Sequence, residues 1–326
     1  MFNKKLRGIS DYFFIGLIII AIACSLAEYL SNWHRYFEFT TGYKLQFLLI
    51  ALCSLMYFLL RRRQLWLALS LLCVLLNLAE IMPWYFGSSQ VTNLEQYQPL
   101  KVLSYNALWK NKDYDRAIAL VNREQPDIAV FQEAISHWHP KLAALKPNYP
   151  YHVSAEKLEI EVYSKLPLNN TQIELYGTYR GLVISDIEVG DRAVKFIATH
   201  AYPQLYWGRG GWLIRNKHLQ NGIGKYVSYL DRPAIVLGDL NVTMWSPFYR
   251  SMIETSGLRN ARQGRGILPT HSIVTPRFAA LSAPLDHCLV TPDIQVKDFK
   301  LGPAIGSDHL PIIAELLIPT NEPTNN

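Results

Sequence analysis

Three long apolar runs lie within the first 86 residues and constrain this chain more than any other feature. They cover residues 12–27, 45–60 and 65–86, and the third is broken by Asn77 and Glu80. A helix that crosses a bilayer needs about 20 mostly apolar residues. Three such runs in series are rare in the core of a soluble domain. The sequence therefore predicts a transmembrane anchor of three spans over residues 1–86.

Two other interpretations of these runs stay open at this point. The runs could form buried helices of a soluble protein. Alternatively, the basic residues Lys4, Lys5 and Arg7 before an apolar stretch also describe a signal peptide. Residues 21–24 resemble a lipoprotein cleavage box, although Ala21 stands where a Leu is usual. Because two more runs follow, we favour an uncleaved first span.

The basic residues next to the runs predict how the anchor is oriented. Lys and Arg gather in the short cytoplasmic loops of membrane proteins. The N-terminal tail carries three of them and residues 61–63 are all Arg, whereas the loop between the first two runs has only Arg35 and Lys44. We therefore expect a multi-pass integral membrane protein with a cytoplasmic N-terminus. Residues from 87 onward would lie outside the cytoplasm, in the periplasm if the protein is bacterial.

The net charge of +6 is unevenly distributed along the chain. Residues 1–90 carry eight basic and four acidic residues, and the remainder carries 24 basic and 22 acidic residues. Proteins that bind nucleic acid strongly usually show a marked basic excess, so the larger part lacks that compositional sign. Of the four cysteines, only Cys288 lies outside the apolar runs. An internal disulfide in the larger part is therefore excluded.

The pattern changes twice after residue 86. Residues 87–99 are polar with Gly, Ser and Pro, and predict a linker that reaches at most about 43–47 Å when fully extended. From residue 100 to 318, short apolar strands alternate with amphipathic helices, a pattern typical of an α/β domain. Residues 319–326 are polar and predict a disordered tail.

Chemically active side chains recur where these strands end. They are Asn106, Glu133, His200, Asp239, Asn241, Asp286, Asp308 and His309. Carboxylates brought together at one edge of a sheet repel one another unless a cation neutralises them. Oxygen donors without paired cysteines suit Mg²⁺, and also Mn²⁺ or Ca²⁺. Taken singly, each residue also has an ordinary explanation, such as a helix cap for Glu133 or an Asx-turn at Asp239.

Six short motifs in order resemble the endonuclease/exonuclease/phosphatase superfamily. They are SYN at 104–106, DIAVFQEA at 127–134, ATH at 198–200, GDLN at 238–241, LDHCLV at 285–290 and SDHLP at 307–311. The resemblance covers about residues 100–318 and implies a catalytic domain with an α/β fold. In that fold, two mixed sheets and outer helices form a four-layer α-β-β-α sandwich, here preceded by three transmembrane helices.

The resemblance also implies which residues bind the metal and the phosphate. Glu133 would be the principal metal ligand, and Asn106 beside it would hold the phosphate or the metal. Asp308 would add a carboxylate near the metal, and His200 would contact the scissile phosphate. We further expect a flexible rim at the glycine-rich residues 208–211, where Arg209 is a candidate for binding phosphate.

The remaining implied roles concern water and protons. Asp239 would orient or deprotonate the attacking water, and Asn241 would position it. His309 would stabilise the developing charge, with Asp286 orienting its ring. Alternation along the strand sends the neighbour His287 to the other face, so we interpret His287 as structural.

These features predict a membrane-anchored, divalent-metal-dependent phosphoric ester hydrolase in which water attacks phosphorus directly. The tether near the bilayer favours a membrane-proximal phosphodiester such as a phospholipid headgroup. A set of aromatic residues near the motifs supports an interfacial position, although half of them could be core residues. They are Tyr202, Tyr206, Trp207, Trp212 and Trp245.

Two alternatives stay open for the function. One is a nuclease acting on extracytoplasmic DNA or RNA, since exposed aromatics also stack on unpaired bases. The other is a catalytically inactive receptor or scaffold. The partners expected from sequence are membrane lipids and the phosphodiester substrate, and no protein partner is predicted.

Overall fold

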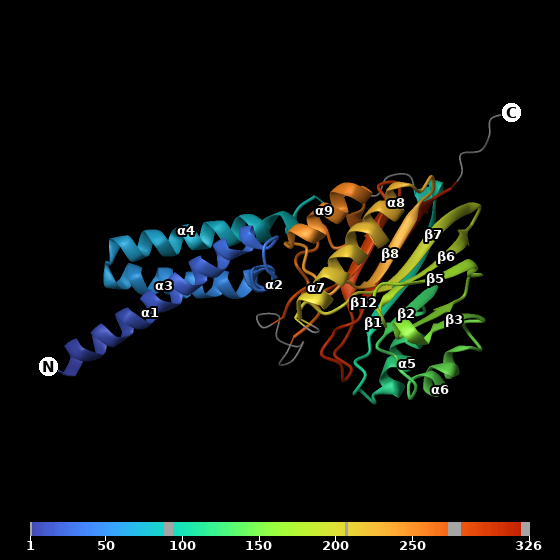
Figure 1. The fold of residues 1–326 in the computed structure, drawn as a ribbon, viewed down its shortest axis with the longest axis horizontal. Coiled ribbons are helices and arrows are strands. Elements are labelled where there is room, and N and C mark those ends of the chain that lie inside the picture. Colours follow the sequence, from blue (N-terminus) through green and yellow to red (C-terminus); the bar gives the residue numbers. More distant parts are fainter. Residues whose placement is uncertain (1, 88–93, 206–207, 273–281, 321–326) are drawn as a thin grey trace.

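The computed structural model describes residues 2–87, 94–205, 208–272 and 282–320. Within these ranges, three helices at the N-terminus extend away from an α/β domain (Figure 1). The segments that are long and apolar enough to cross a membrane are Gly8–Leu30, Arg35–Arg61 and Gln64–Tyr85. They contain the helices α1 (Phe2–Ala27), α3 (Lys44–Arg61) and α4 (Gln64–Ile81). The three apolar runs are therefore helical, as the sequence predicts.

Polar side chains join these helices at two places. Asp11 forms ion pairs with Arg61 and Arg63 at 3.0 and 3.1 Å, so the turn after α3 lies beside α1. Asn77 donates a hydrogen bond to Ser25 Oγ at 2.9 Å. Asn77, a polar interruption of the third run, is therefore buried against α1, where its side-chain amide has a hydrogen-bond partner.

The α/β domain contains two six-stranded sheets packed face to face. The first has the order β11-β12-β1-β2-β4-β3, and the second β5-β6-β7-β8-β10-β9. The strands are β1 (Tyr97–Asn106), β2 (Ile128–Gln132), β3 (Tyr151–Ala155), β4 (Ile160–Ser164), β5 (Asn169–Leu175), β6 (Gly181–Val189), β7 (Arg192–His200), β8 (Ala234–Asp239), β9 (Arg259–Asn260), β10 (Asp286–Val290), β11 (Gln295–Leu301) and β12 (Ile312–Pro319).

Alternating apolar residues place one core between the sheets and one on each outer face. Val102 and Val130 of the first sheet meet Phe196 and Leu237 of the second. The outer helices are α5 (Tyr114–Glu124), α6 (His139–Leu142), α7 (Gly208–Lys217), α8 (Tyr226–Ser228) and α9 (Pro247–Ser256), with a π-helix at His218–Lys225 between α7 and α8. The domain is therefore the predicted four-layer α-β-β-α sandwich.

Strand direction gathers the predicted site residues at one end of the sandwich. β1 pairs in parallel with β2, and β7 in parallel with β8. β10 runs antiparallel to β8, so its first residue, Asp286, pairs with Asp239, the last residue of β8. The carboxyl ends of four strands and the start of β10 therefore provide the functional side chains.

Some local structure differs from the sequence-based expectations. Strand β1 begins at Tyr97, so it includes the last residues of the predicted linker. Gly208 begins α7, so residues 208–211 form a helical turn instead of a flexible rim. Strands β5 and β9 and helix α9 were not expected, because each is short or weakly periodic. The predicted disordered tail, 319–326, falls mostly outside the described residues, although Pro319 closes β12.

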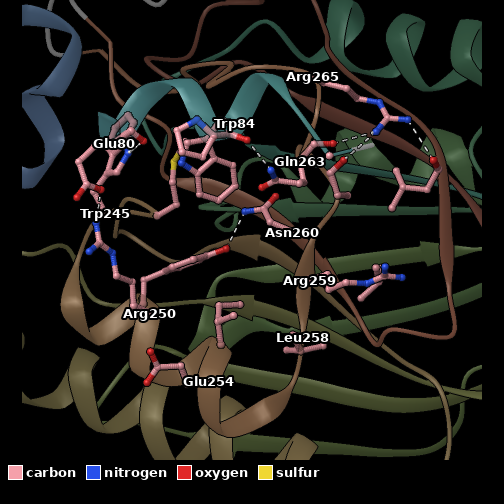
Figure 2. Close-up of a pocket in the computed structure, with 18 residues that line it drawn as sticks. Glu80, Trp84, Trp245, Arg250, Glu254, Leu258, Arg259, Asn260, Gln263 and Arg265 are labelled. Carbon is pink, nitrogen blue, oxygen red and sulfur yellow. Dashed lines mark hydrogen bonds and ion pairs between the residues drawn. The ribbon is translucent and has the colours of Figure 1, made fainter. Parts of the chain in front are cut away.

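The anchor and the domain share a continuous interface. Apolar residues of α3 and α4 belong to the same buried cluster as Leu240, Val242 and Met244. At the end of α4, Arg250 of α9 pairs with Glu80 at 2.5 Å, and Gln263 Nε2 donates to Pro83 O at 2.6 Å. These contacts border a cleft of about 480 Å³ (Figure 2). None of the predicted site residues is among the described residues that line this cleft.

Gly238 is required where β8 lies against β7. Its φ is +149°, and an added Cβ would lie 2.0 Å from the carbonyl oxygen of Thr199. We predict that Gly238→Ala lowers the Tm by more than Gly257→Ala does. At Gly257, φ is +69° but nothing lies within 4 Å of an added Cβ, so that variant isolates the cost of the positive φ, about 1–2 kcal/mol. Equal Tm values for the two variants would contradict the close approach of the strands.

Candidate active site

Asn106 and Glu133 meet at the ends of β1 and β2. Asn106 Nδ2 donates to Glu133 Oε1 at 3.3 Å and to Asp239 Oδ2 at 3.0 Å. Glu133 follows β2 with a φ of +53°, and its other oxygen accepts from the backbone N–H of Trp109 at 3.2 Å. The amide of Asn106 thus joins a carboxylate from each sheet.

Asp239 and Asn241 form a closed set of hydrogen bonds after β8. The backbone N–H of Asn241 donates to Asp239 Oδ1 at 2.7 Å, and Asn241 Nδ2 donates to Asp239 Oδ2 at 3.1 Å and to Ala201 O at 2.9 Å. Asn241 has a φ of +50°, a conformation that Asn tolerates better than most residues. The expected Asx-turn is present, and it fixes the orientation of the buried Asp239 carboxylate.

Asp286 and His309 form the central ion pair. His309 Nδ1 lies 2.8 Å from Asp286 Oδ2, and His309 Nε2 lies 3.9 Å from Asp239 Oδ2. Burial disfavours the imidazolium, but the carboxylates of Asp286 and Asp239 outweigh it and raise the pKa of His309 to about 10. Burial also opposes charge on Asp286, yet the positive His309 holds the pKa of Asp286 below its usual value. The pair is therefore charged at neutral pH.

Asp239 differs from Asp286 in its proton affinity. Burial and the neighbouring Asp286 carboxylate raise the pKa of Asp239 to about 7, against the opposing charge of His309. A carboxylate with a pKa near neutrality is suited to accept a proton from water. The geometry thus provides one candidate base, Asp239, and one candidate cationic group, His309.

His200 ends β7 and faces the same carboxylates. Its Nε2 lies 3.9 Å from Glu133 Oε1 and 3.9 Å from Asp239 Oδ2, and the side chain is fully buried. Burial holds the pKa of His200 well below its usual value, so the ring is neutral. Neither ring nitrogen has a hydrogen-bond partner among the described residues. Buried polar groups are nearly always hydrogen-bonded, so an unpartnered imidazole beside two carboxylates indicates a position where a ligand would supply the missing hydrogen bond.

Asp308 lies beside a histidine that the sequence did not single out. His271 Nε2 is 3.7 Å from Asp308 Oδ2, and the rings of His271 and His309 are 4.6 Å apart. The described ion pairs join Asp308 to His271, not to Glu133. His271 belongs to no sequence motif. It reaches the site through a β-bridge to His309, which lies 38 positions later in the sequence.

The donor set fits a divalent cation. Two groups of side chains have ligand atoms within 4.8 Å of one another, namely Asp239, Asp286 and His309, and His271, Asp308 and His309. Both contain His309, which is protonated beside Asp286, so the carboxylate oxygens are the donors that remain for a metal. An oxygen of Glu133 and an oxygen of Asp239 both accept from Asn106 Nδ2, so these two carboxylates lie close together. Hard cations prefer such oxygen donors, and a cation would relieve the repulsion between these carboxylates.

Other predicted residues lie elsewhere. Arg209 is exposed in the first turn of α7, and none of its described contacts reaches the cluster. His287 points away from the site, where its Nε2 lies 2.8 Å from Val242 O. Tyr202, Trp212 and Trp245 are buried, so they do not form an aromatic rim. Tyr206 and Trp207 lie outside the described residues, whereas Trp109, which the sequence analysis missed, is half exposed beside Glu133.

Comparisons with known proteins agree with this geometry. The model of the Endonuclease/Exonuclease/phosphatase family matches residues 103–309. No curated protein matches the chain. Truncated TDP2 from Caenorhabditis elegans has a TM-score of 0.55 and 18% identity, covering 67% of this chain and 97% of that chain. An endonuclease/exonuclease/phosphatase from Beutenbergia cavernae has a TM-score of 0.54 and 17% identity, covering 68% and 72%.

The fold, the cluster at the strand ends and the family match define a hydrolase of phosphoric esters. The α/β sandwich that has this activity follows, in the sequence, three helices that are long and apolar enough to span a membrane. The chain belongs to the Endonuclease/Exonuclease/phosphatase family.

The charged pair at the centre of the site predicts a pH effect. Asp286→Asn should lower kcat about 10²–10⁴-fold with little change in KM, because the pair acts in the transition state. His309 stays protonated up to about pH 10 beside Asp286. Without that carboxylate its pKa falls, so the alkaline limb of the kcat profile should move to lower pH. Asp293→Asn, on the surface, is the control, and equal pH profiles would contradict the pairing.

Proposed function

We propose that this protein is a membrane-anchored, metal-dependent phosphodiesterase that hydrolyses the phosphodiester of a phospholipid headgroup. One observation carries the choice of substrate: residues 31–46, here called the anchor loop, pack against the rim of the active site. This segment follows the first span, contains α2 (Arg35–Phe39) and the short 3₁₀ helix at Thr40–Tyr43, and ends in the first turn of α3.

Three contacts define this packing. Gln204 Nε2 donates to Arg35 O at 3.2 Å, just beyond the end of β7. The hydroxyls of Thr41 and Thr243 are 3.1 Å apart, two residues after Asn241. Gln46 Nε2 donates to Ser282 O at 3.4 Å, before Asp286. The anchor therefore contacts three chain segments that precede or follow site residues, which supports a substrate held at the bilayer surface.

Exposed aromatic residues lie in the 3₁₀ helix Glu28–Leu30, in the anchor loop and in α2, which Figure 1 shows at the end of the anchor next to the domain. Tyr29, Trp33 and Tyr36 are 65%, 78% and 57% exposed. Tyr and Trp favour the interface between lipid headgroups and acyl chains. If they lie at that depth, the packing of the anchor loop brings the catalytic rim next to the headgroups.

Asn106 and Glu133, with Asp308 nearby, would hold Mg²⁺ or a similar divalent ion. The ion, when bound, would neutralise negative charge on the phosphate. Asp239, held by Asn106 and Asn241, accepts a proton from the attacking water. His309, kept cationic by Asp286, stabilises the charge that develops on the phosphoryl oxygens, and the neutral His200 donates a hydrogen bond to a phosphate oxygen.

The topology is part of the proposal. Residues 1–86 form the anchor, 87–99 link it to the catalytic domain at 100–318, and that domain lies outside the cytoplasm. The Asp11 ion pairs support this, because they bring residues 61–63 and the first helix together at the end remote from the domain. Positive residues at that end favour the cytoplasm.

Nucleic acid is the second candidate substrate. The structure of Danio rerio TDP2 was solved with a single strand DNA product and has a TM-score of 0.56 to this chain, with 15% identity over 67% of this chain and 98% of that chain. The exposed Trp109 beside Glu133 could stack on an unpaired base. The near balance of charge in residues 91–326 favours the lipid instead.

A side-by-side assay tests the function. The full-length protein in detergent is given phospholipid vesicles, single- and double-stranded DNA, and RNA. We expect hydrolysis of the lipid diester to an alcohol and a phosphomonoester, here called release of lipid phosphate, that stops in EDTA and returns with Mg²⁺ or Mn²⁺. Glu133→Gln should lose most activity, whereas the exposed Glu188→Gln should keep it. Cleavage of DNA without release of lipid phosphate would overturn the lipid proposal, and full activity in EDTA would overturn the metal role.

Reporter fusions test the topology. A reporter after residue 326 should be active only in its extracytoplasmic form, and one inserted at Gln64 should be active only in its cytoplasmic form. A C-terminal reporter active in the cytoplasm would contradict the three-span orientation.

A further inference from the structure

The membrane anchor supplies a buried charge to the catalytic domain. Glu38, in α2 of the anchor loop, is fully buried. Its Oε1 accepts from Ser246 Oγ at 2.6 Å, and its Oε2 accepts from Trp212 Nε1 at 2.5 Å and forms an ion pair with Arg215. A buried carboxylate is costly unless such partners surround it. All three partners belong to the catalytic domain.

Arg215 continues this contact to the active site. Its guanidinium is fully buried, and Nη1 donates to the carbonyl oxygen of Asn241 at 3.1 Å. Asn241 in turn holds both oxygens of Asp239, and its φ of +50° depends on its surroundings. A continuous series of hydrogen bonds therefore runs from Glu38 through Arg215 and Asn241 to the candidate base.

Ser246 connects the same carboxylate to the other end of this segment. Its hydroxyl donates to Glu38 and also accepts from Phe248 N at 3.2 Å, which caps α9. Residues 239–246, here called the catalytic loop, are thus fixed by Glu38 at Asn241 and at Ser246. Sequence motifs alone give Glu38 no role, because it lies about 200 positions before the loop that it contacts.

We propose that Glu38 is a positioning residue for the catalytic loop, acting through Arg215, so that the membrane anchor completes the active site. This rests on the proposed phosphodiesterase function. Asp239 must keep one orientation toward the attacking water, since small displacements of a catalytic group lower rates steeply. Removal of the Glu38 charge leaves Arg215 buried without its counter-ion. Asn216 Oδ1 still accepts from Arg215 Nε and Nη2 at 3.2 and 2.8 Å, so the contact with Asn241 is weakened but not lost.

Glu38→Gln tests this in the full-length protein, and Glu80→Gln is its matched control. Both residues are anchor carboxylates that pair with an arginine of the catalytic domain, but Arg250, the partner of Glu80, lies on the side of α9 that borders the cleft of Figure 2. With a soluble phosphodiester, bis-p-nitrophenyl phosphate, kcat of Glu38→Gln should fall roughly 10- to 100-fold with KM nearly unchanged. Glu80→Gln should keep the wild-type kcat.

Hydrogen–deuterium exchange gives a readout that does not need activity. Residues 239–246 should exchange faster in Glu38→Gln than in the wild type or in Glu80→Gln. A double-mutant cycle identifies the route: in an Asn241→Ala background, Glu38→Gln should have little further effect on kcat. If Glu38→Gln does not fold, Arg215→Lys makes the same test, because it keeps the charge and loses the paired donors.

The outcomes separate the two proposals. If the wild type hydrolyses no phosphodiester, the function is wrong, and the exchange data still decide whether Glu38 orders the catalytic loop. If the wild type is active but Glu38→Gln matches Glu80→Gln in both kcat and exchange, the positioning role is overturned. Full additivity of Glu38→Gln and Asn241→Ala would also overturn it.

Discussion

Repulsion between two buried carboxylates is the constraint on which this active site depends. Asp239 and Asp286 are paired across β8 and β10, and both are almost fully buried. Two such charges are tolerated only when other groups offset them. His309 offsets Asp286 directly, whereas Asp239 accepts hydrogen bonds from Asn106 and Asn241 and binds a proton more readily. The same pairing therefore creates one fixed anion and one group able to exchange a proton.

The anchor extends this arrangement beyond the sandwich. Its buried Glu38 meets Arg215, which contacts the residue that orients Asp239. The anchor does not only hold the domain near the membrane. Its polar contacts reach the catalytic loop, and its apolar residues belong to the same buried cluster as Leu240, Val242 and Met244. The active site and the anchor are therefore parts of one packed structure.

Much of the fold was predictable because its signals are local. The apolar run at residues 65–86 predicted α4, and the short apolar segments before Asn106 and Asp239 predicted β1 and β8. The motif residues Asn106, Glu133, Asp239, Asp286 and His309 do lie together. His271 was missed because it reaches Asp308 and His309 only after the chain folds, through contacts between segments far apart in sequence. The expected rim of Trp212 and Trp245 was wrong, since both rings are buried against the anchor.

The sequence by itself determined three apolar helices, an α/β pattern and the residue types that close its strands, because periodicity and composition depend on near neighbours. Only the tertiary structure decided which carboxylates face each other and which of them binds a proton more readily. It also decided that Glu38 of the anchor reaches Arg215 of α7. Burial removes water from these groups, and their charges are then set by partners that folding brings from distant parts of the chain.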